Sequence, residues 1–275
     1  MRFFSQAIKS CWRALIGLTL LSVSFTAFAE KITIAAASDL KFAMDEIVMQ
    51  YKSLNPMDEI EVIYGSSGKM LTQIQQGAPY DLYFSADISY PNQLSTEGLA
   101  LGQVKPYAIG RIVLWAPKTK FDASKMTLES LVNKDIHRIA IANPKHAPYG
   151  KRAEEALKFA NVWDKVEPKL IYGENIAQTA QFVQTGNADV GIIALSLALS
   201  SELAKIGNYW MIPAEWHHPL EQGFVMTKHA ENNKAAKSFT QLMTTPEVRK
   251  IMVKYGFILP NEAIIKGYPY LVIDI

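Results

Sequence analysis

The feature that most constrains this chain is a repeated alternation of short apolar runs with amphipathic stretches. The first block holds strand-like runs at 31–36, 60–64 and 81–85, and the second holds runs at 138–142, 169–172 and 190–195. Strands that are joined through a helix usually enter one sheet in parallel, because the helix carries the chain back across the sheet face. We therefore predict an α/β protein with two lobes, each a mostly parallel sheet flanked by helices.

The stretches between these runs have the period of helices. In the first stretch, Leu40, Ala43, Met44 and Ile47 recur at three- and four-residue spacing, and a Pro at position 56 ends the pattern. Further helices are expected at 70–76, 129–133, 150–159, 176–185, 233–243 and 246–255, and further strands at 111–116 and 223–227. Apolar residues make up 49% and charged residues 20% of the chain, which is a globular composition and excludes a disordered or multi-span membrane protein.

No low-complexity segment or Pro/Gly-rich linker separates the two blocks. The chain can cross between lobes through short strands near 110–112 and 220–223, and two such crossings form a two-stranded hinge. A hinge of that kind makes the first lobe discontinuous. We predict a signal peptide at 1–29, lobe I from 30–111 together with 222–275, and lobe II from 112–221.

The N-terminus has the three parts of a secretory signal. Arg2, Lys9 and Arg13 form a basic head, residues 14–23 are mostly apolar, and residues 27–29 read Ala-Phe-Ala. This pattern predicts cleavage after Ala29 and export to the periplasm. The alternative is an uncleaved membrane anchor, for which the apolar run is short.

Removal of the leader changes the charge and the cysteine content. The chain carries 28 basic and 26 acidic residues, and three of the basic residues lie in the leader, which leaves 25 against 26 and a net charge of −1. No basic patch for nucleic acid is implied. The single cysteine, Cys11, also lies in the leader. The mature chain therefore has no disulfide, no thiolate nucleophile and no cysteine metal site.

Four turns that precede predicted helices are rich in small residues and hydrogen-bond donors. They lie at 35–38, 65–68, 147–150 and 174–177, two in each block. Ligands of open parallel sheets bind beyond the carboxyl ends of the strands, and helix N-termini attract anions through free backbone N–H groups. Ser38 and Ser67 add hydroxyl donors. The pattern indicates a cleft for a small anion, although a serine before a helix is more often only an N-cap.

Five stretches also carry a family resemblance. Their sequences are AAASDLKFAM, YGSSGKMLTQIQQGAPYDLYFSAD, ANPKHAPYGKRAEEAL, GENIAQTAQFVQTGNADVGIIALS and KYGFILP. In this order they resemble the periplasmic molybdate-binding proteins of ABC importers, over about residues 31–260. The resemblance implies a type II periplasmic binding protein fold. It also implies a protein without cofactor that binds molybdate, and also tungstate, and delivers it to a membrane permease. The sequence gives no sign of oligomerisation, so a monomer is expected by default.

The resemblance assigns four residues to the oxyanion. Ser38 and Ser67 match the serines of the first two turns, and Tyr149 and Ile176 match positions where backbone amides of the second lobe donate. Many family members place a tyrosine hydroxyl at the position of Ala194, so this donor must come from water, from Tyr149, or not at all. The carboxylate of Asp39 would repel a dianion, and we expect it to turn away and cap the following helix.

Two alternative functions remain open at this stage. A periplasmic phosphate-ester hydrolase would use one of the two serines, and it requires a base beside Ser38 or Ser67. A binding protein for another anion, such as sulfate, would keep the same cleft. An organic acid usually requires an arginine clamp, for which Arg152 is the nearest candidate.

Three other signals favour structural roles. Lys69 follows a glycine-rich turn that lacks the full phosphate-loop pattern, and it is expected to be a solvated helix residue. His146 is expected to be a loop residue near the cleft. His217 and His218 are adjacent and face apart, so a surface pair is favoured over a metal site.

Overall fold

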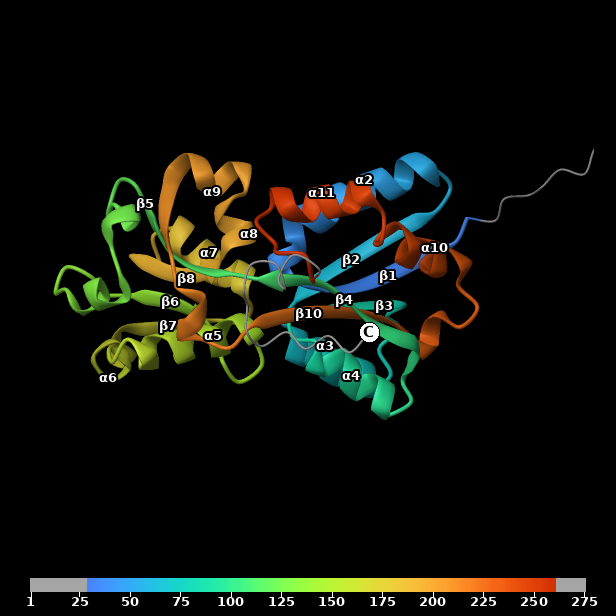
Figure 1. Ribbon diagram of the computed structural model, residues 1–275, viewed down its shortest axis with the longest axis horizontal. Coiled ribbons are helices and arrows are strands. Elements are labelled where there is room, and N and C mark those ends of the chain that lie inside the picture. The colour runs from blue at the N-terminus through green and yellow to red at the C-terminus, as the bar shows by residue number, and fades with distance from the viewer. Residues whose placement is uncertain (1–28, 261–275) are drawn as a thin grey trace, which may run out of the picture.

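The structure is a computed structural model, and it describes residues 29–260. The predicted leader, apart from Ala29, and the tail after Pro260 lie outside the described residues. Within 29–260, no helix has both the length and the apolar character that a membrane crossing requires. The two predicted lobes are visible side by side in Figure 1.

The first sheet has the strand order β2-β1-β3-β10-β4. Its strands are β1 Lys31–Ala37, β2 Glu59–Gly65, β3 Leu82–Ser85, β4 Ala100–Gly110 and β10 Leu220–Thr227. Strand β1 pairs in parallel with β2 and β3, whereas β10 is antiparallel to both β3 and β4. The sheet is therefore mixed, with a parallel part that ends at one common edge.

The second sheet repeats this arrangement as β7-β6-β8-β5-β9. Its strands are β5 Ile112–Pro117, β6 Ile139–Ala142, β7 Leu170–Gly173, β8 Val190–Ala194 and β9 Gly207–Met211. Strand β6 pairs in parallel with β7 and β8, and β5 is antiparallel to β8 and β9. The prediction of two α/β lobes is confirmed, although each sheet is mixed.

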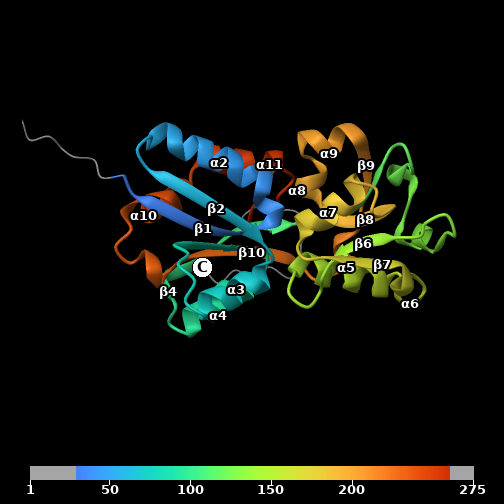
Figure 2. The same ribbon diagram turned by 180° about the vertical axis from the view of Figure 1, so that it is seen from behind.

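Helices cover both faces of each sheet. Figures 1 and 2 show α2 and α11 over one face of the first sheet and α3 and α4 over the other, while α8 and α9 lie opposite α5 and α6 in the second lobe. Their bounds are α2 Lys41–Leu54, α3 Ser67–Gln75, α4 Ser89–Thr96, α5 Pro148–Phe159, α6 Trp163–Val166, α7 Ile176–Gln184, α8 Leu195–Ala198, α9 Ser201–Ile206, α10 Lys234–Leu242 and α11 Pro246–Lys254.

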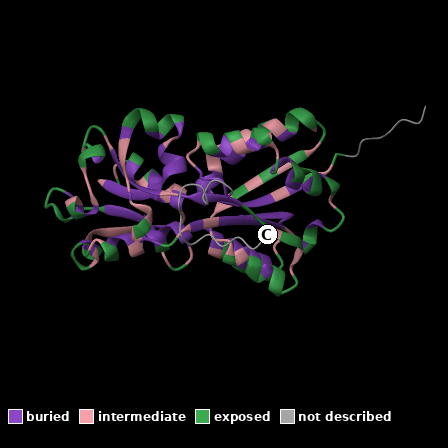
Figure 3. Cartoon of the chain, viewed as in Figure 1, coloured by how far each residue is buried: buried purple, intermediate pink, exposed green. Residues whose placement is uncertain are grey.

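Short 3-10 turns join several of these elements. They are η1 Ser38–Leu40, η2 Ala123–Lys125, η3 Leu128–Val132, η4 Glu167–Lys169, η5 Ala214–Trp216 and η6 Lys228–Ala230. The helix expected at 129–133 is the 3-10 turn η3. Figure 3 shows that the inner strands of both sheets are largely buried between the helices, whereas the edge strands are partly exposed.

The sequence patterns missed two strands, β4 and β9, and both are edge strands. Strand β4 contains Gly102, which has a φ of +73°, and Pro106. Pro and Gly weaken a strand signal and are tolerated where one side of the strand has no ladder partner. An edge position therefore explains why β4 has no clear apolar period.

The chain passes between the sheets at two adjacent places. Strand β4 continues through Arg111 into β5, and β10 returns to the first sheet with Leu220 paired to Gly110. The predicted boundary at 111/112 falls between β4 and β5, whereas the boundary at 221/222 falls inside β10. The division into lobe I (30–111 and 222–275) and lobe II (112–221) remains a proposal, and the two names are used in that sense below.

Candidate functional site

A small cavity lies where the two lobes meet. Its volume is about 10 Å³, roughly the room that a single water molecule needs, so the two lobes pack closely around it. Its lining comes from both lobes and is Ala37, Ser38, Asp39, Gly65, Ser66, Ser67, Ala86, Ala147, Pro148, Tyr149 and Ile176. All four residues that the sequence assigned to the oxyanion are in this set.

Lobe I presents its two serines where β1 and β2 end. Ser38 begins the turn η1 directly after β1, and Ser67 is the first residue of α3, two residues after β2. Both side chains are buried. The Ser67 hydroxyl oxygen accepts a hydrogen bond from the amide of Ala86 at 3.0 Å, and its backbone oxygen accepts one from Tyr83 at 2.7 Å. These contacts hold Ser67 against β3 and leave its hydroxyl proton available for a ligand.

Lobe II presents two helix N-termini at the ends of β6 and β7. Pro148 opens α5 and has no N–H, so Tyr149 supplies the first amide donor of that helix. A side chain at Gly150 would collide with the backbone oxygen of Ala142, which lets α5 begin directly against the end of β6. Ile176 opens α7, because the Asn175 side chain caps it by accepting from Gln178 N at 3.0 Å. First-turn amides have no acceptor within their own helix, and both termini carry partial positive charge.

The Ser38 hydroxyl already links the lobes. It donates to Asn175 Oδ1 at 3.1 Å and accepts from the amide of Ala177 at 3.2 Å. Ser38 thus lies at the N-terminus of α7, and the lobes are closed on one another. A ligand in the cavity would compete for this hydroxyl or share it.

A second set of contacts between the lobes surrounds His146. Its Nδ1 lies 2.9 Å from Ser66 Oγ, and its backbone oxygen accepts from the amide of Gly68 at 2.9 Å. Lys69 forms an ion pair with Glu174 of the other lobe. Lys69 is an exposed helix residue and His146 a loop residue near the cleft, as expected, but both also contact the other lobe, which the sequence did not indicate.

The carboxyl group of Asp39 lies in a buried polar cluster. Its Oδ2 accepts from the Tyr149 hydroxyl at 3.0 Å and from Gln222 Nε2 at 2.8 Å, and Gln222 Nε2 also donates to the tyrosine oxygen at 3.1 Å. The turn and helix that follow Asp39 have no side-chain cap. The expected helix cap is therefore wrong, since the carboxyl group is bonded to residues far away in sequence.

Burial raises the pKa of the Asp39 carboxyl to about 6, and the hydrogen bonds from Gln222 and Tyr149 only partly offset this rise.

Ala194 is buried at the end of β8 and brings no hydroxyl. The Tyr149 hydroxyl donates to Asp39, so it is already committed and does not replace the donor that Ala194 lacks.

The other candidates do not join the cavity. Arg152 forms ion pairs with Glu155 at 2.5 Å and Asp87 at 4.0 Å, so it is not an arginine clamp for an organic acid here. His217 is buried and its Nδ1 lies 2.7 Å from the backbone oxygen of His218. Across residues 29–260 no group of three His, Cys, Asp or Glu side chains is placed to hold a metal ion.

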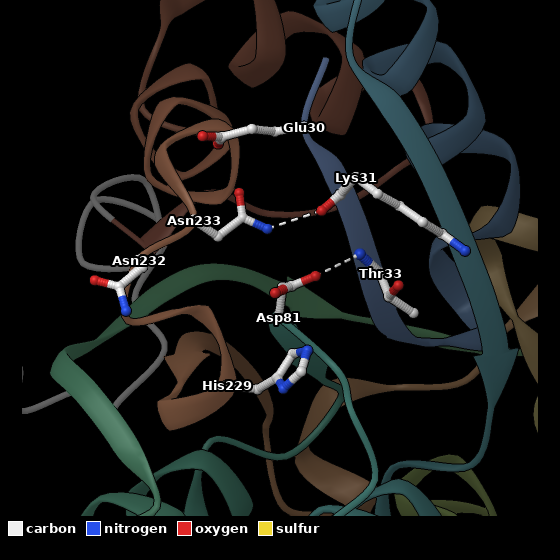
Figure 4. A pocket seen from close by; sticks show the side chains of 7 residues that line it. All are labelled: Glu30, Lys31, Thr33, Asp81, His229, Asn232 and Asn233. Carbon is white, nitrogen blue, oxygen red and sulfur yellow. Dashed lines mark hydrogen bonds between the residues drawn. The ribbon is translucent and has the colours of Figure 1, made fainter. Parts of the chain in front are cut away.

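A second depression lies at the far end of the first sheet (Figure 4). Its lining is Glu30, Lys31, Thr33, Asp81, His229, Asn232 and Asn233. The polar groups there support the chain, since Asp81 accepts from Thr33 N at 2.7 Å and Asn233 donates to Lys31 O at 2.8 Å. The polar side chains of this depression therefore stabilise the local backbone. The helix N-termini that could bind an anion lie at the interlobe cavity instead.

The amino-acid sequence is similar to a family of bacterial solute-binding proteins and to several molybdate-binding proteins. Residues 32–258 match the family model described as bacterial extracellular solute-binding protein. The chain is 39% identical to the molybdate-binding protein ModA of Rhodobacter capsulatus over 71% of this chain and 75% of that protein. It is 29% identical to ModA of Azotobacter vinelandii over 89% and 96%.

Solved structures show the same architecture. The periplasmic molybdate-binding protein of Azotobacter vinelandii superposes with a TM-score of 0.76 at 30% identity, covering 83% of this chain and 99% of that one. The sulfate-binding protein SubI of Mycobacterium tuberculosis H37Rv superposes with a TM-score of 0.70 at 14% identity, covering 86% and 89%. The second similarity concerns the fold alone.

Proposed function

The chain belongs to the bacterial extracellular solute-binding protein family, and we propose that it binds molybdate between its lobes for delivery to an ABC transporter permease. The observation that carries this proposal is the convergence of Ser38 and Ser67 from lobe I with the starts of α5 and α7 from lobe II on one small cavity between the lobes. Relatives named as molybdate-binding proteins match the chain from one lobe through the other.

In this proposal the anion is held by uncharged donors. The hydroxyls of Ser38 and Ser67 and the amides of Tyr149 and Ile176 donate to its oxygens, and the two helix N-termini offset its double negative charge. Such hydrogen bonds are strong because the acceptor is charged and the donor residues are buried. Hydrogen phosphate carries a proton that requires an acceptor, so a site built from donors disfavours it.

The finer features of the proposal follow from the same residues. Tungstate has the shape and charge of molybdate, so we propose that both ions bind. We propose a monomer without catalytic activity or cofactor, exported to the periplasm and cleaved after Ala29. The hydrolase alternative lacks support at the two serines, since the Ser38 hydroxyl bonds Asn175 and Ala177 and the carboxyl of Asp39 bonds Tyr149 and Gln222.

Titration calorimetry of the protein with molybdate, tungstate, sulfate and phosphate tests the function. We expect molybdate and tungstate to bind with submicromolar dissociation constants, about −8 kcal/mol or stronger, and phosphate to bind far more weakly. Sulfate binding as tight as molybdate binding would overturn the assignment of the ligand. Hydrolysis of a phosphate ester by the purified protein would contradict the assignment as a binding protein.

A further inference from the structure

The two carboxyl oxygens of Asp39 have unequal surroundings. Oδ2 accepts the two hydrogen bonds from Tyr149 and Gln222, at 3.0 and 2.8 Å. Oδ1 is buried and has no hydrogen-bond partner among the residues that the structure describes. A buried carboxylate oxygen without a hydrogen bond of normal geometry is costly, because it has lost water and the nearby backbone amides of Asp39 and Leu40 only partly compensate for that loss.

The burial of this carboxyl group depends on lobe closure. Tyr149 lies on α5 in lobe II, and Ser196 on α8 of the same lobe donates to the backbone oxygen of Asp39 at 2.7 Å. Gln222 comes from β10 in lobe I. A side chain at Gly110 would overlap the Tyr149 hydroxyl, so its glycine makes room for the cluster. Opening the lobes would separate Asp39 from Tyr149 and Ser196 and let water reach the carboxyl group.

A bound dianion would raise the cost of a negatively charged carboxylate at Asp39 further. Asp39 lines the same cavity as Ser38, so a carboxylate there would repel the ligand in a medium that screens poorly. A proton on Oδ1 removes the negative charge, turns the bare oxygen into a hydroxyl group, and leaves both hydrogen bonds to Oδ2 in place. Burial already raises the pKa of this carboxyl group to about 6, and a nearby dianion acts in the same direction.

Within residues 29–260, the side chains that form hydrogen bonds with Asp39 are all uncharged. Tyr149 and Tyr107 are the titratable side chains that interact with Asp39, and burial raises the pKa of both hydroxyls well above the usual value, which keeps them neutral. The packed residues Gln222 and Ser196 are uncharged. Lys41, which follows the turn, lies at the surface and pairs with Asp45.

We propose that closing the lobes on a dianion takes up one proton from solvent at Oδ1 of Asp39, so that the ligand meets a neutral acid. This inference rests on the proposed function. Its consequence is that the anion binds more tightly as the pH falls toward 6 and leaves more readily at higher pH. The direction of proton exchange distinguishes Asp39 from His146. Burial lowers the pKa of His146, so closure around this histidine would release a proton rather than take one up.

Calorimetry with sodium molybdate, in pairs of buffers that differ in ionisation enthalpy, measures the protons exchanged on binding. At about pH 7 we expect net proton uptake, and we expect the dissociation constant to be about tenfold lower at pH ~6 than at pH ~8, as one unit of pKa shift gives. Molybdate remains a dianion over this range.

The variant Asp39→Asn imitates the neutral acid. Its amide oxygen can accept both hydrogen bonds of Oδ2, and its NH₂ group takes the place of the protonated Oδ1. We expect it to bind molybdate without proton exchange and, at pH ~8, about as tightly as the wild type does at pH ~6. Asp135→Asn, at an exposed position on lobe II, is the matched control and should exchange protons as the wild type does.

A measurement on the wild type does not depend on the variant folding. Carbon-13 NMR of labelled aspartate carboxyls should show Asp39 protonated to a higher pH in the molybdate-loaded protein than in the free protein. Binding without proton uptake, or uptake that persists in Asp39→Asn, would overturn this inference alone. A complete lack of molybdate binding would overturn the proposed function and the inference together.

Discussion

The two lobes have the same sheet order but bring different kinds of donor to the cavity. Lobe I presents side-chain hydroxyls, Ser38 after β1 and Ser67 after β2, whereas lobe II presents the backbone starts of α5 after β6 and α7 after β7. A hydroxyl can rotate toward a ligand or a protein partner, as Ser38 does toward Asn175. A first-turn amide points where its helix points and cannot be removed by changing a side chain.

From this difference we expect the lobe II amides to fix the position of the proposed anion and the lobe I hydroxyls to rotate toward it. The contacts across the cleft fit this division only in part, because the hydroxyl of Ser38 meets the backbone amide of Ala177, whereas the backbone oxygen of Asp39 in lobe I accepts from the side chain of Ser196 in lobe II. The following predictions test this comparison, beginning with the largest expected effect.

Gly68→Ala should prevent the lobes from closing without destabilising the fold of either lobe. The added Cβ would lie 2.7 Å from the backbone oxygen of His146, which cannot move without shifting the start of α5. Without closure the lobe II donors are lost, so we expect molybdate affinity to fall about a hundredfold or more, at about 1.4 kcal/mol for each tenfold. Alanine is about 1 kcal/mol better than glycine in a helix, so the free protein should melt no earlier than the wild type.

Calorimetry and a thermal melt of the same sample measure both effects. Gln76→Ala, at an exposed position at the end of α3, is the control and should keep the wild-type affinity. Wild-type affinity in Gly68→Ala would show that α3 does not approach His146 in the loaded protein.

Ser67→Ala tests whether a side-chain hydroxyl of lobe I binds the anion. We expect it to weaken molybdate binding by about 1–3 kcal/mol, the range for leaving a buried partner without its hydrogen bond. The matched variant Ser95→Ala changes an exposed serine of the same lobe and should have no effect on the dissociation constant. An unchanged constant for Ser67→Ala would remove this hydroxyl from the site.

The stability of the closed form should depend on pH through Asp39. Burial raises its pKa from 3.8 to about 6, so the folded protein binds the proton more tightly than the unfolded chain. The resulting stability is fully present below about pH 3.8 and is lost as the pH rises through about 6. Asp39→Asn should therefore raise the melting temperature of the loaded protein by about 2–4 °C at pH ~8 and by less at pH ~5.

A scan of melting temperature against pH, with Asp135→Asn beside it, measures this effect. An equal gain at both pH values would mean that the charge of Asp39 does not limit stability.

Lys69→Ala should have the smallest effect. The ion pair of Lys69 with Glu174 joins the lobes, but the two side chains are 54% and 42% exposed, so it should contribute about 0.2–1 kcal/mol to closure. Lys31 pairs with Glu61 at similar exposures of 57% and 52% within lobe I, so Lys31→Ala is the matched control. We expect Lys69→Ala alone to weaken binding slightly at low salt, and the difference to vanish at high salt. Equal effects of the two variants would show that the ion pair is irrelevant to closure.

The periodic patterns located most of the elements that position the cavity. Helix α2, strand β1 and strand β8 lie close to where the apolar runs predicted them, because burial against a sheet requires the same spacing in any context. Of the four edge strands, β2 and β7 were predicted and β4 and β9 were missed; in β4, Gly102 and Pro106 weaken the strand signal. The turns at 35–38, 65–68, 147–150 and 174–177 were found from small residues before helices, and the structure brings them to one cavity.

The contacts across the cleft had no signal in the sequence. Gln222 lies 183 residues from Asp39, and nothing near either residue marks their hydrogen bond. His146 and Lys69 were taken as ordinary loop and surface residues, although both contact the other lobe. The expectation that Asp39 caps its own helix also failed, because Tyr149 and Gln222 compete for the same carboxyl group.

By itself, the sequence determined the two-lobed α/β architecture and the turns that carry the serines and helix starts, since these follow from local spacing and backbone chemistry. The tertiary structure alone decided which groups meet across the cleft, how the Asp39 carboxyl is bonded, and which of its oxygens has no partner. The physical reason is that local patterns report how one segment is buried, whereas contacts between lobes depend on how two separately folded sheets are oriented at the hinge.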